Sequence, residues 1–414
     1  MSPAPASMVG QEFVVDVGPV AHGGHCVARH EGLVLFVRHA LPDERVRVRV
    51  TGGRQGDRFL RADAIEILTP SPHRVSAPCR YAGPAGCGGC DFQHAELSYQ
   101  RDLKAAVVQE QLARLAGIDR EVTVLPLPGA PDGLRWRTRI ELAVDRRGRV
   151  GLRPHRSHAV LPLEDCLIAA PPIPDSGVFQ RTYPRAKTVH VVASATGERA
   201  IVAAPQGLRK TPTLHEQVRI GEQDVTFRLN ALGFWQVHPG AAQTFVATVL
   251  AGLAPAPGER CLDLYAGVGL FARALADAVG PGGEVVAVEA DARAAQAAAD
   301  HFASDGHVRV IHGRSERALT EQAEAAGPES RFDLAVLDPP RTGAGREVLA
   351  GLAALRPRAI AYVACDPAAL ARDLGYASEL GYALADLTAY DAFPMTHHVE
   401  CVAILRPAAA ADPA

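Results

Sequence analysis

Two residues near the C-terminus have the chemistry of a covalent catalyst, and the first is a cysteine at the end of an apolar segment. Cys365 follows the run AYVA and precedes DPAALARDL, whose apolar residues have helical spacing. A cysteine between a strand and a helix lies near the helix N-terminus, where the helix dipole favours the thiolate over the thiol. The sequence therefore predicts that Cys365 is a nucleophile.

The second residue is Glu400, which stands immediately before the apolar run CVAIL. One reaction that would need a thiol together with a base is methylation of uracil at carbon 5. This carbon is too weak a nucleophile to accept a methyl group unaided, so an enzyme would first add a thiolate to carbon 6. A general base must then remove the proton from carbon 5 before the thiol can leave. A carboxylate at a partly buried strand start can serve as this base, and we expect Glu400 to act with Cys365 in one site.

A pair of glycines marks an expected cofactor site. In CLDLYAGVGLFARALA an apolar strand runs through Gly267 and Gly269 directly into a helix, so a ligand can approach the backbone and the helix N-terminus. Glu289 ends the next strand, where its carboxylate can accept hydrogen bonds from ribose hydroxyls. Because the third glycine of the dinucleotide-binding pattern is missing, the turn favours adenosylmethionine over NAD. Asp338, in LDPPRTG, is expected at the same edge of the sheet.

Four further cysteines form a separate group, and they are Cys79, Cys87 and Cys90 in PCRYAGPAGCGGCDFQH and Cys166 in LEDCLIA. Eight cysteines, unevenly placed along 414 residues, are not the pattern of a disulfide scaffold. Four thiolates can hold an iron-sulfur cluster or a zinc ion, and the spacing does not choose between them. The sequence therefore predicts a metal site. We expect the remaining three, Cys26, Cys261 and Cys401, in the core.

Sequence patterns also predict the elements that must position these residues. After Pro257, apolar strands alternate with Ala-rich helices, which indicates a parallel sheet covered on both faces. Short β-like runs broken by Gly-rich turns at 13–68 predict a small antiparallel barrel. The segment 96–116 has apolar residues at helical spacing without Gly or Pro, which predicts a helix. Short strands return from Trp136 to about Phe227 and predict a second β-rich region.

The expected fold class is therefore a multidomain α/β protein. Its expected domains are an OB-like β-barrel at 8–68, a β-rich central domain with the cysteines at 74–92 and 125–227, and a Rossmann-like domain formed by the helix at 93–124 together with 228–408. No signal peptide or membrane-spanning run is visible in the sequence, so we expect a cytoplasmic protein, and a monomer by default.

The formal net charge of −3 gives no overall attraction to nucleic acid, so RNA binding would depend on local arginines. Alternating arginines on a strand share one face, and such a face could follow a phosphate backbone. The candidate arginines are Arg45, Arg47, Arg49, Arg54, Arg58 and Arg61 in the barrel, and Arg135, Arg137, Arg139, Arg146, Arg147, Arg149, Arg153 and Arg156 in the central domain.

Taken together, the motifs resemble those of the RNA 5-methyluridine methyltransferases, in particular the bacterial 23S rRNA uracil-5-methyltransferase branch. The stretch HGGHCVARHEGLVLFVRHALPDERVRVRV resembles the TRAM RNA-binding barrel, and DLYAGVGLF, LDPPR, ACDPAALARDL and HHVECVAIL follow in the order of the family. The resemblance covers nearly the whole chain. It implies a class I methyltransferase domain that uses S-adenosyl-L-methionine.

The resemblance also implies roles for individual residues. A [4Fe-4S] cluster, with zinc less favoured, would be held by Cys79, Cys87, Cys90 and Cys166. Phe234 and Gln236, in GFWQVHP, would contact the substrate and the cofactor respectively. Further cofactor contacts are implied for Tyr265, Glu289 and Asp338. The chain departs from the pattern at Asp366 and His238, where many members have Asn.

Two alternatives from other classes are left open by the residues. The first is another adenosylmethionine-dependent nucleic-acid methyltransferase, acting on cytosine carbon 5 or on an amino group. Against it, the DPP motif is followed by Arg341 and not by the aromatic residue of amino methyltransferases, and no cysteine stands beside the prolines. The second is a non-catalytic RNA-binding or iron-sulfur protein, which would lack the nucleophile or the base. We favour ribosomal over transfer RNA as the substrate, and the sequence does not identify the uridine.

Overall fold

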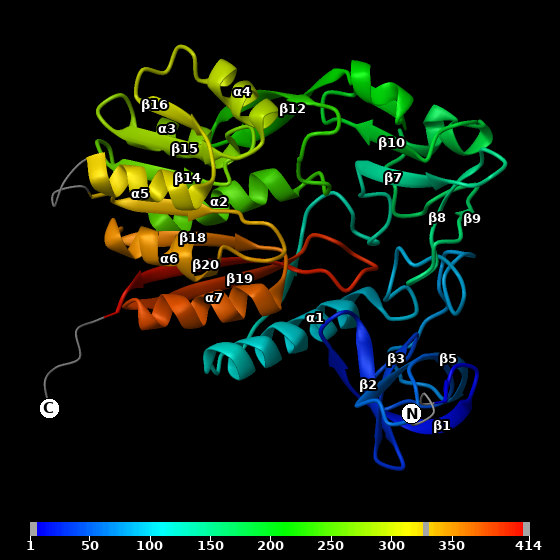
Figure 1. The fold of residues 1–414 in the computed structure, drawn as a ribbon. Helices are drawn as coiled ribbons and strands as arrows, with labels where there is room; N and C mark the ends of the chain where they lie inside the picture. The colour runs from blue at the N-terminus through cyan, green and yellow to red at the C-terminus, as the bar shows by residue number, and fades with distance from the viewer. Residues whose placement is uncertain (1–5, 326–330, 409–414) are drawn as a thin grey trace, which may run out of the picture.

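The structure is a computed structural model that describes residues 6–325 and 331–408. It has three parts: an N-terminal small barrel, a central β-rich region and a large α/β sheet (Figure 1). The large sheet is formed mainly by the C-terminal half of the chain and takes one edge strand from the segment before the central region. One long helix, α1, runs between the barrel and the large sheet (Figure 1). Within the described ranges, no helix has the length and apolar character needed to cross a membrane.

The N-terminal part is a closed five-stranded barrel, as the sequence predicts, but it is not wholly antiparallel, because one pair of neighbouring strands, Leu33–Arg38 and Phe59–Thr69, runs in parallel. Its strands are β1 (Glu12–Ala21), β2 (His25–His30), β3 (Leu33–Arg38), β4 (Arg45–Gly52) and β5 (Phe59–Thr69), joined in the order β1-β2-β3-β5-β4. Along β4 every second residue is apolar and buried, including Val46 and Val48, while Arg45 and Arg49 are exposed. This period of two gives the barrel a core and leaves its arginines outside.

The helix expected at 96–116 is present. It consists of α1 (Leu97–Gln111) and a π-helical turn (Leu112–Ala116), and Gly117 ends it in the left-handed conformation that glycine tolerates. Lys104, which is fully buried, donates from Nζ to Asp391 Oδ1 at 2.5 Å and to the carbonyl oxygen of Phe393 at 3.1 Å. These contacts tie α1 to the segment that follows β19.

The central region is β-rich, as expected, and contains two antiparallel sheets. The first has the order β11-β10-β7-β8-β9, and the second is a hairpin of β12 and β13. The bounds are β7 (Arg139–Val144), β8 (Val150–Leu152), β9 (Leu161–Pro162), β10 (Thr188–Ala193), β11 (Arg199–Ala204), β12 (Thr213–Ile220) and β13 (Gln223–Asn230). Short 3-10 turns lie at Pro174–Ser176, Val178–Gln180 and Gln206–Lys210.

The large sheet has the order β16-β15-β14-β17-β18-β20-β19-β6. Its bounds are β6 (Val124–Pro126), β14 (Arg260–Leu264), β15 (Glu284–Glu289), β16 (Val308–His312), β17 (Leu334–Leu337), β18 (Ala359–Ala364), β19 (Tyr382–Asp391) and β20 (Glu400–Pro407). The strands from β16 to β18 are parallel, and β20 is antiparallel to both of its neighbours. The antiparallel β20 therefore brings its first residues to the edge where the parallel strands end.

Helices cover both faces of this sheet, which confirms the predicted doubly wound fold (Figure 1). On one face lie α2 (Ala241–Leu253), α3 (Leu270–Val279) and α4 (Ala292–His301). On the other lie α1, α5 (Ser315–Ala325), α6 (Gly345–Ala354) and α7 (Pro367–Glu379). Successive residues of β14 belong to different cores, with Cys261 in the first and Leu262 in the second, because strand side chains alternate between faces.

Candidate active site

The glycine-rich turn between β14 and α3 forms an open cradle at the carboxyl edge of the sheet. Gly267 has φ +57° and nothing within 4 Å of the position that a Cβ would occupy, so its face is free for a ligand. Gly269, at φ +94°, would place a Cβ only 2.6 Å from the ring of Phe302. Only glycine fits there, and the helix α3 starts at the next residue.

Glu289 and Asp263 bring carboxylates to this turn. Glu289, at the end of β15, accepts hydrogen bonds from the backbone N–H of Gly267 at 2.7 Å and of Asp291 at 2.6 Å. Asp263 is fully buried, and its Oδ2 accepts from the N–H of Ala272 at 2.8 Å. Its Oδ1 has no hydrogen-bond partner among the described residues, and burial raises its pKa well above the usual range.

Asp263 is not among the site residues predicted from the sequence. The available signal was a charged residue inside the apolar strand CLDL, since a buried charge needs a compensating partner or a function. Its unpartnered oxygen is consistent with a ligand that donates a hydrogen bond at this turn.

A cavity of about 530 Å³ opens beside the turn. Its walls include Tyr265, Ala290, Ser315 and Pro340, which lie just beyond four neighbouring strands. This volume is within the range of small-molecule sites, and the position beyond the strand ends is where open α/β folds bind ligands. The predicted contacts Tyr265, Gly267, Glu289 and Asp338 thus gather at one edge of the sheet.

Cys365 and Glu400 lie side by side at the same edge. Ala364, the last residue of β18, pairs with Cys401 of β20, so the residue after Ala364 is opposite the residue before Cys401. Glu400 is buried, with 2% of its surface exposed, whereas Cys365 is partly accessible. Asp338 follows β17, the other neighbour of β18, and its charge acts on both groups.

Burial, together with two neighbouring carboxyl groups, raises the pKa of the Cys365 thiol. Burial, followed by the carboxyls of Glu400 and Asp338, raises the pKa of Cys365 to about 12, and Arg341 opposes the effect. Burial likewise raises the pKa of Glu400 well above its usual range and that of Asp338 to about 7. The sequence led us to expect that the dipole of α7 would favour the thiolate, but burial beside two carboxyls outweighs it.

The loop between β13 and α2 carries the other two expected contacts, Phe234 and Gln236. Phe234 projects into solvent with 72% of its surface exposed. Gln236 is buried and lines a different cavity, of about 180 Å³. Between them, Trp235 belongs to the same core cluster as Ala266 and Val268 of the glycine-rich turn. The loop is therefore anchored in the core on the α2–α4 face of the large sheet.

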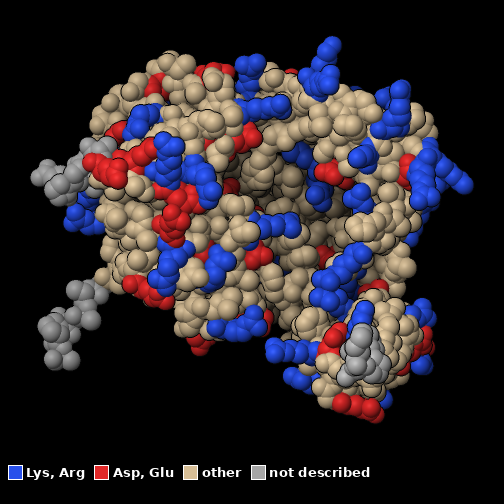
Figure 2. Space-filling view, in the orientation of Figure 1, with Lys and Arg blue, Asp and Glu red and all other residues tan. Residues whose placement is uncertain are grey.

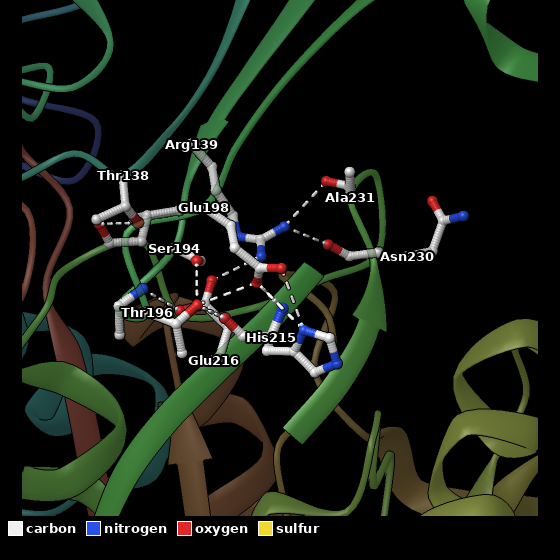
Figure 3. Close-up of polar contacts among 12 residues, drawn as sticks. Thr138, Arg139, Ser194, Thr196, Glu198, His215, Glu216, Asn230 and Ala231 are labelled. Carbon is white, nitrogen blue, oxygen red and sulfur yellow. Dashed lines mark hydrogen bonds and ion pairs between the residues drawn. The ribbon is translucent and has the colours of Figure 1, made fainter. Parts of the chain in front are cut away.

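The start of β7 holds this loop by its backbone (Figure 3). Arg139 Nη1 donates to the carbonyl oxygens of Ala231 at 3.1 Å and Gly233 at 3.0 Å. The neighbouring Thr138 donates from Oγ1 to the carbonyl oxygen of Val237 at 3.0 Å. Two residues of the central sheet thus fix both ends of the segment that presents Phe234.

Arg139 is itself fixed by a buried carboxylate. Its Nη2 donates to Glu216 Oε1 at 2.9 Å, and Glu216 Oε2 accepts from the N–H of Ala195 at 2.9 Å (Figure 3). The two side chains are 11% and 4% exposed. The prediction that Arg139 belongs to an exposed phosphate-binding face is therefore wrong, because the side chain is used inside the protein to anchor the loop.

Both the N-terminal and the C-terminal part of the chain match known protein families. The sequence model of the tRNA (uracil-5-)-methyltransferases matches residues 184–407, which include the cradle, Cys365 and Glu400. An uncharacterised RNA methyltransferase of Streptomyces coelicolor is 49% identical over 98% of this chain and 95% of its own length. The chain belongs to the RNA (uracil-5-)-methyltransferase family. It is an adenosylmethionine-dependent RNA methyltransferase, and a TRAM domain model matches its residues 6–65.

Two further matches are a curated relative and a solved structure. The 23S rRNA (uracil(1939)-C(5))-methyltransferase of Pseudomonas aeruginosa is 32% identical over 97% of this chain and 95% of its own length. The crystal structure of the tRNA (uracil-54, C5)-methyltransferase of Pyrococcus abyssi, in complex with S-adenosyl-L-homocysteine, has a TM-score of 0.68. It shares 20% identity and covers 95% of this chain and 100% of its own, so it shows the same fold.

One departure of this methyltransferase from the usual family pattern is His238, at the end of the loop. It is buried, stacks on Trp136 with ring centroids 5.9 Å apart, and accepts at Nδ1 from the N–H of Gly240 at 3.2 Å. Burial lowers its pKa to about 4, so the ring is neutral at physiological pH. We therefore interpret His238 as a packing residue of the loop.

Four cysteines of the methyltransferase line one cavity of about 120 Å³, and they are Cys79, Cys87, Cys90 and Cys166. All eight cysteines of the chain are free thiols, and the N–H of Gly89 donates to Cys87 Sγ at 3.4 Å. Burial raises the pKa of Cys87 to about 11 and raises that of Cys90 further. Within 6–325 and 331–408, no three His, Cys, Asp or Glu side chains are placed to hold one metal ion.

The TRAM domain presents arginines on the outer face of β4, as expected from their alternation. Arg47 pairs with Glu66 and Arg49 with Glu12, both at 2.8 Å, and all four side chains are at least one-third exposed. Exposed pairs of this kind contribute little free energy, so the arginines can exchange their partners for phosphates. In Figure 2, Lys and Arg side chains border a hollow between the three parts of the molecule.

Proposed function

We propose that this methyltransferase transfers the methyl group of adenosylmethionine to carbon 5 of a uridine in RNA, with Cys365 as covalent nucleophile and Glu400 as base. The observation that carries the proposal is the juxtaposition of Cys365, Glu400 and Asp338 beside the cofactor cradle. A thiol next to a carboxyl group is the combination that addition and elimination at neighbouring carbons of a pyrimidine require.

Cys365 first loses its thiol proton to solvent, and the thiolate adds to carbon 6, so that the electron pair of the 5,6 double bond becomes an enolate centred on carbon 5. Carbon 5 then takes the methyl group, and S-adenosylhomocysteine leaves with the electron pair of the broken sulfur–methyl bond. Glu400, as a carboxylate, accepts the proton that remains on carbon 5, the double bond re-forms, and the thiolate leaves. Glu400 releases that proton to solvent and the thiolate takes a proton back, so the enzyme returns to its starting state without any change of oxidation level.

The residues of the cradle fit adenosylmethionine. Gly267 leaves an open face, Glu289 offers a carboxylate beside it, and Asp263 has a buried oxygen without a partner. Adenosylmethionine supplies the methyl group, and its positive charge favours the ionised forms of the carboxyls and thiol around it. Binding of adenosylmethionine should therefore lower the pKa of Cys365 and Glu400, which burial raises.

For the target, we favour 23S rRNA over tRNA. The relative named for 23S rRNA shares 32% identity with this chain over nearly its whole length, compared with 20% for the structure named for tRNA. The exposed arginines of the TRAM domain and the exposed Phe234 provide phosphate and base contacts of the kind that RNA-binding proteins use.

We also propose that the cavity lined by four cysteines holds a [4Fe-4S] cluster. The four thiols are free and line the walls of one cavity. Four thiolates can hold either a zinc ion or an iron-sulfur cluster, and the resemblance to the 23S rRNA branch of the family favours the cluster. Anaerobically purified protein should contain about four iron atoms per chain. Cys79→Ser should lose the iron, whereas the control Cys26→Ala, in the barrel core, should keep it; iron retained in Cys79→Ser would contradict the proposal.

The experiment that tests the activity identifies the methylated nucleoside. Total RNA from cells lacking this protein is incubated with the enzyme and methyl-labelled adenosylmethionine, digested to nucleosides and analysed by mass spectrometry. We expect labelled 5-methyluridine from the 23S rRNA fraction, and none with Cys365→Ala. Labelled 5-methylcytidine or an N-methylated base would favour the rival methyltransferase reactions, and no label at all would favour a non-catalytic RNA-binding protein.

A further inference from the structure

The turn between β1 and β2 of the TRAM domain reaches the catalytic residues. His22 Nε2 lies 3.1 Å from Oδ2 of Asp366, the residue that follows Cys365. Two residues later, Gly24 lies so close to His397 that a Cβ on the glycine would be 2.6 Å from the Cβ of the histidine. A single turn of the barrel therefore touches the chain next to the nucleophile and the segment that leads into Glu400.

The two carboxylate oxygens of Asp366 contact different partners. Oδ1 accepts from the N–H of Ala369 at 2.8 Å and so caps helix α7, while Oδ2 faces His22. The side chains of His22 and Asp366 are 39% and 24% exposed, so the contact lies at the edge of the domain interface. Because Asp366 is covalently joined to Cys365, a contact that fixes Asp366 restricts the place of the thiol.

A second set of contacts secures the same turn. Gly24 has φ +77°, a conformation that other residues rarely adopt, and this allows the backbone to approach His397. His397 Nδ1 lies 2.6 Å from Asp91 Oδ2, and Arg38 of the barrel donates to Asp91 Oδ1 at 3.3 Å. The barrel is thus connected to the catalytic segment through Asp91 as well as directly.

We propose that His22 is a positioning residue of the methyltransferase, through which the docked TRAM domain holds Asp366 and, with it, the nucleophile Cys365. The inference rests on the proposed function, because it takes Cys365 to be the nucleophile. It gives the barrel a second role beside RNA binding, since the site is complete only when the barrel is docked. Loss of His22 leaves the cap of α7 intact and removes only the restraint from the barrel side.

The test compares His22→Ala and His22→Gln in the full-length protein, with His215→Ala as the matched control. His215 also pairs with a carboxylate, Glu198, at 3.2 Å, and the two side chains are 45% and 39% exposed. This pair belongs to the central region, with His215 on β12 and Glu198 immediately before β11, whereas Cys365 follows β18 of the large sheet. The measured quantities are kcat, KM for RNA and the rate at which Cys365 forms an adduct with 5-fluorouridine RNA.

We expect His22→Ala to lower kcat and the adduct rate about ten-fold, the order of effect when a charge-assisted hydrogen bond that positions a reacting group is lost, with KM for RNA changed less than about two-fold. His22→Gln, whose amide can donate to Asp366, should recover most of the rate, and His215→Ala should match the wild type. In the double variant His22→Ala with Asp366→Asn, kcat and the adduct rate should be little lower than in His22→Ala alone.

An effect confined to KM for RNA would make His22 an RNA contact and overturn the proposal, as would a His22→Gln rate no better than that of His22→Ala. The proposal would also be overturned if kcat and the adduct rate of His22→Ala equalled those of His215→Ala. Wild-type and Cys365→Ala proteins are measured in parallel. If the wild type forms no adduct, the proposed function fails; if it does and the His22 variants behave like it, only the positioning role fails.

Discussion

Glu400 begins β20 directly across from Cys365, because Cys401 pairs with Ala364 at the end of β18. The two residues are separated by a helix and a strand in the sequence, and the antiparallel insertion of β20 beside β18 brings them together. A thiol and a carboxyl on adjacent strands can act on adjacent atoms of one ring. This relationship is the one that the proposed roles require, with Cys365 at carbon 6 and Glu400 at the proton on carbon 5.

Glu400→Gln should permit methyl transfer but block the elimination that follows it. The amide cannot accept the proton from carbon 5, so the thiol cannot leave after methyl transfer. We expect turnover to fall by about 10²- to 10⁴-fold, the usual contribution of a general base. At the same time a methylated adduct between Cys365 and ordinary, unfluorinated RNA should accumulate and be visible as a shift on a denaturing gel. Loss of turnover without an adduct would mean that Glu400 acts before methyl transfer.

Activity and stability should respond in opposite directions to pH. Burial raises the pKa of Asp338 from 3.8 to about 7, so the folded protein holds a proton that the unfolded chain releases between these values. The resulting stability is present below about pH 4 and is lost as the pH rises toward 7. Glu400 shifts in the same direction, so the base becomes ionised, and the enzyme more active, as the pH rises.

The comparison variant for this effect is Asp338→Asn, which does not titrate. Between pH 5 and pH 8 the unfolding free energy of the wild type should fall relative to that of the variant by on the order of 2 kcal/mol, the free-energy equivalent of the pKa shift over this range. Chemical denaturation at several pH values measures this difference. If the difference in unfolding free energy between wild type and Asp338→Asn were the same at every pH, Asp338 would be ionised over the whole range from pH 5 to pH 8.

Much of the site could be predicted because the α/β pattern itself places strand ends at one edge. Gly267, Glu289, Asp338 and Cys365 each follow or end an apolar strand, so their common location comes from topology rules alone. The barrel and α1 could also be predicted. Apolar residues recur about every second position in strands and about every 3.6 positions in helices, and this pattern can be recognised within a short stretch of sequence.

What the sequence did not reveal depends on partners that are distant along the chain. Arg139 looked like a surface arginine because its anchor, Glu216, lies on another sheet. The direction of the Cys365 pKa was missed because burial and the proximity of Glu400 arise only from the packed sheet. His22, at a barrel turn, gave no sign that it would meet Asp366.

Removing Arg139 should destabilise the protein and disturb the loop that carries Phe234. Arg139→Ala leaves the buried Glu216 unpaired, and the unfolding free energy should fall by about 3 kcal/mol. The double variant Arg139→Met with Glu216→Leu replaces the pair by apolar groups and should recover most of this loss. Its KM for RNA should remain raised, because the carbonyls of the loop still lack their donor. Full recovery of both properties would show that the anchor is not needed for RNA binding.

Phe234 should contribute to RNA binding without contributing to stability. With 72% of its surface exposed, Phe234→Ala should change the unfolding free energy by less than about 0.5 kcal/mol. Loss of one stacked base should raise KM for RNA on the order of ten-fold, and Phe234→Trp should restore it. The affinity for adenosylmethionine, measured by calorimetry, should not change. An unaltered KM for RNA in Phe234→Ala would remove this residue from the substrate site.

The most direct test of the central claim is mass spectrometry of the protein after incubation with adenosylmethionine and RNA that contains 5-fluorouridine. Fluorine cannot leave carbon 5 as a proton does, so elimination is blocked and the covalent intermediate persists. We predict a methylated fluorouridine adduct on the peptide that contains Cys365, absent from Cys365→Ala and absent without adenosylmethionine. Methylation of unmodified RNA by Cys365→Ala at the wild-type rate, with no adduct on the wild type, would contradict the assignment of Cys365 as the nucleophile.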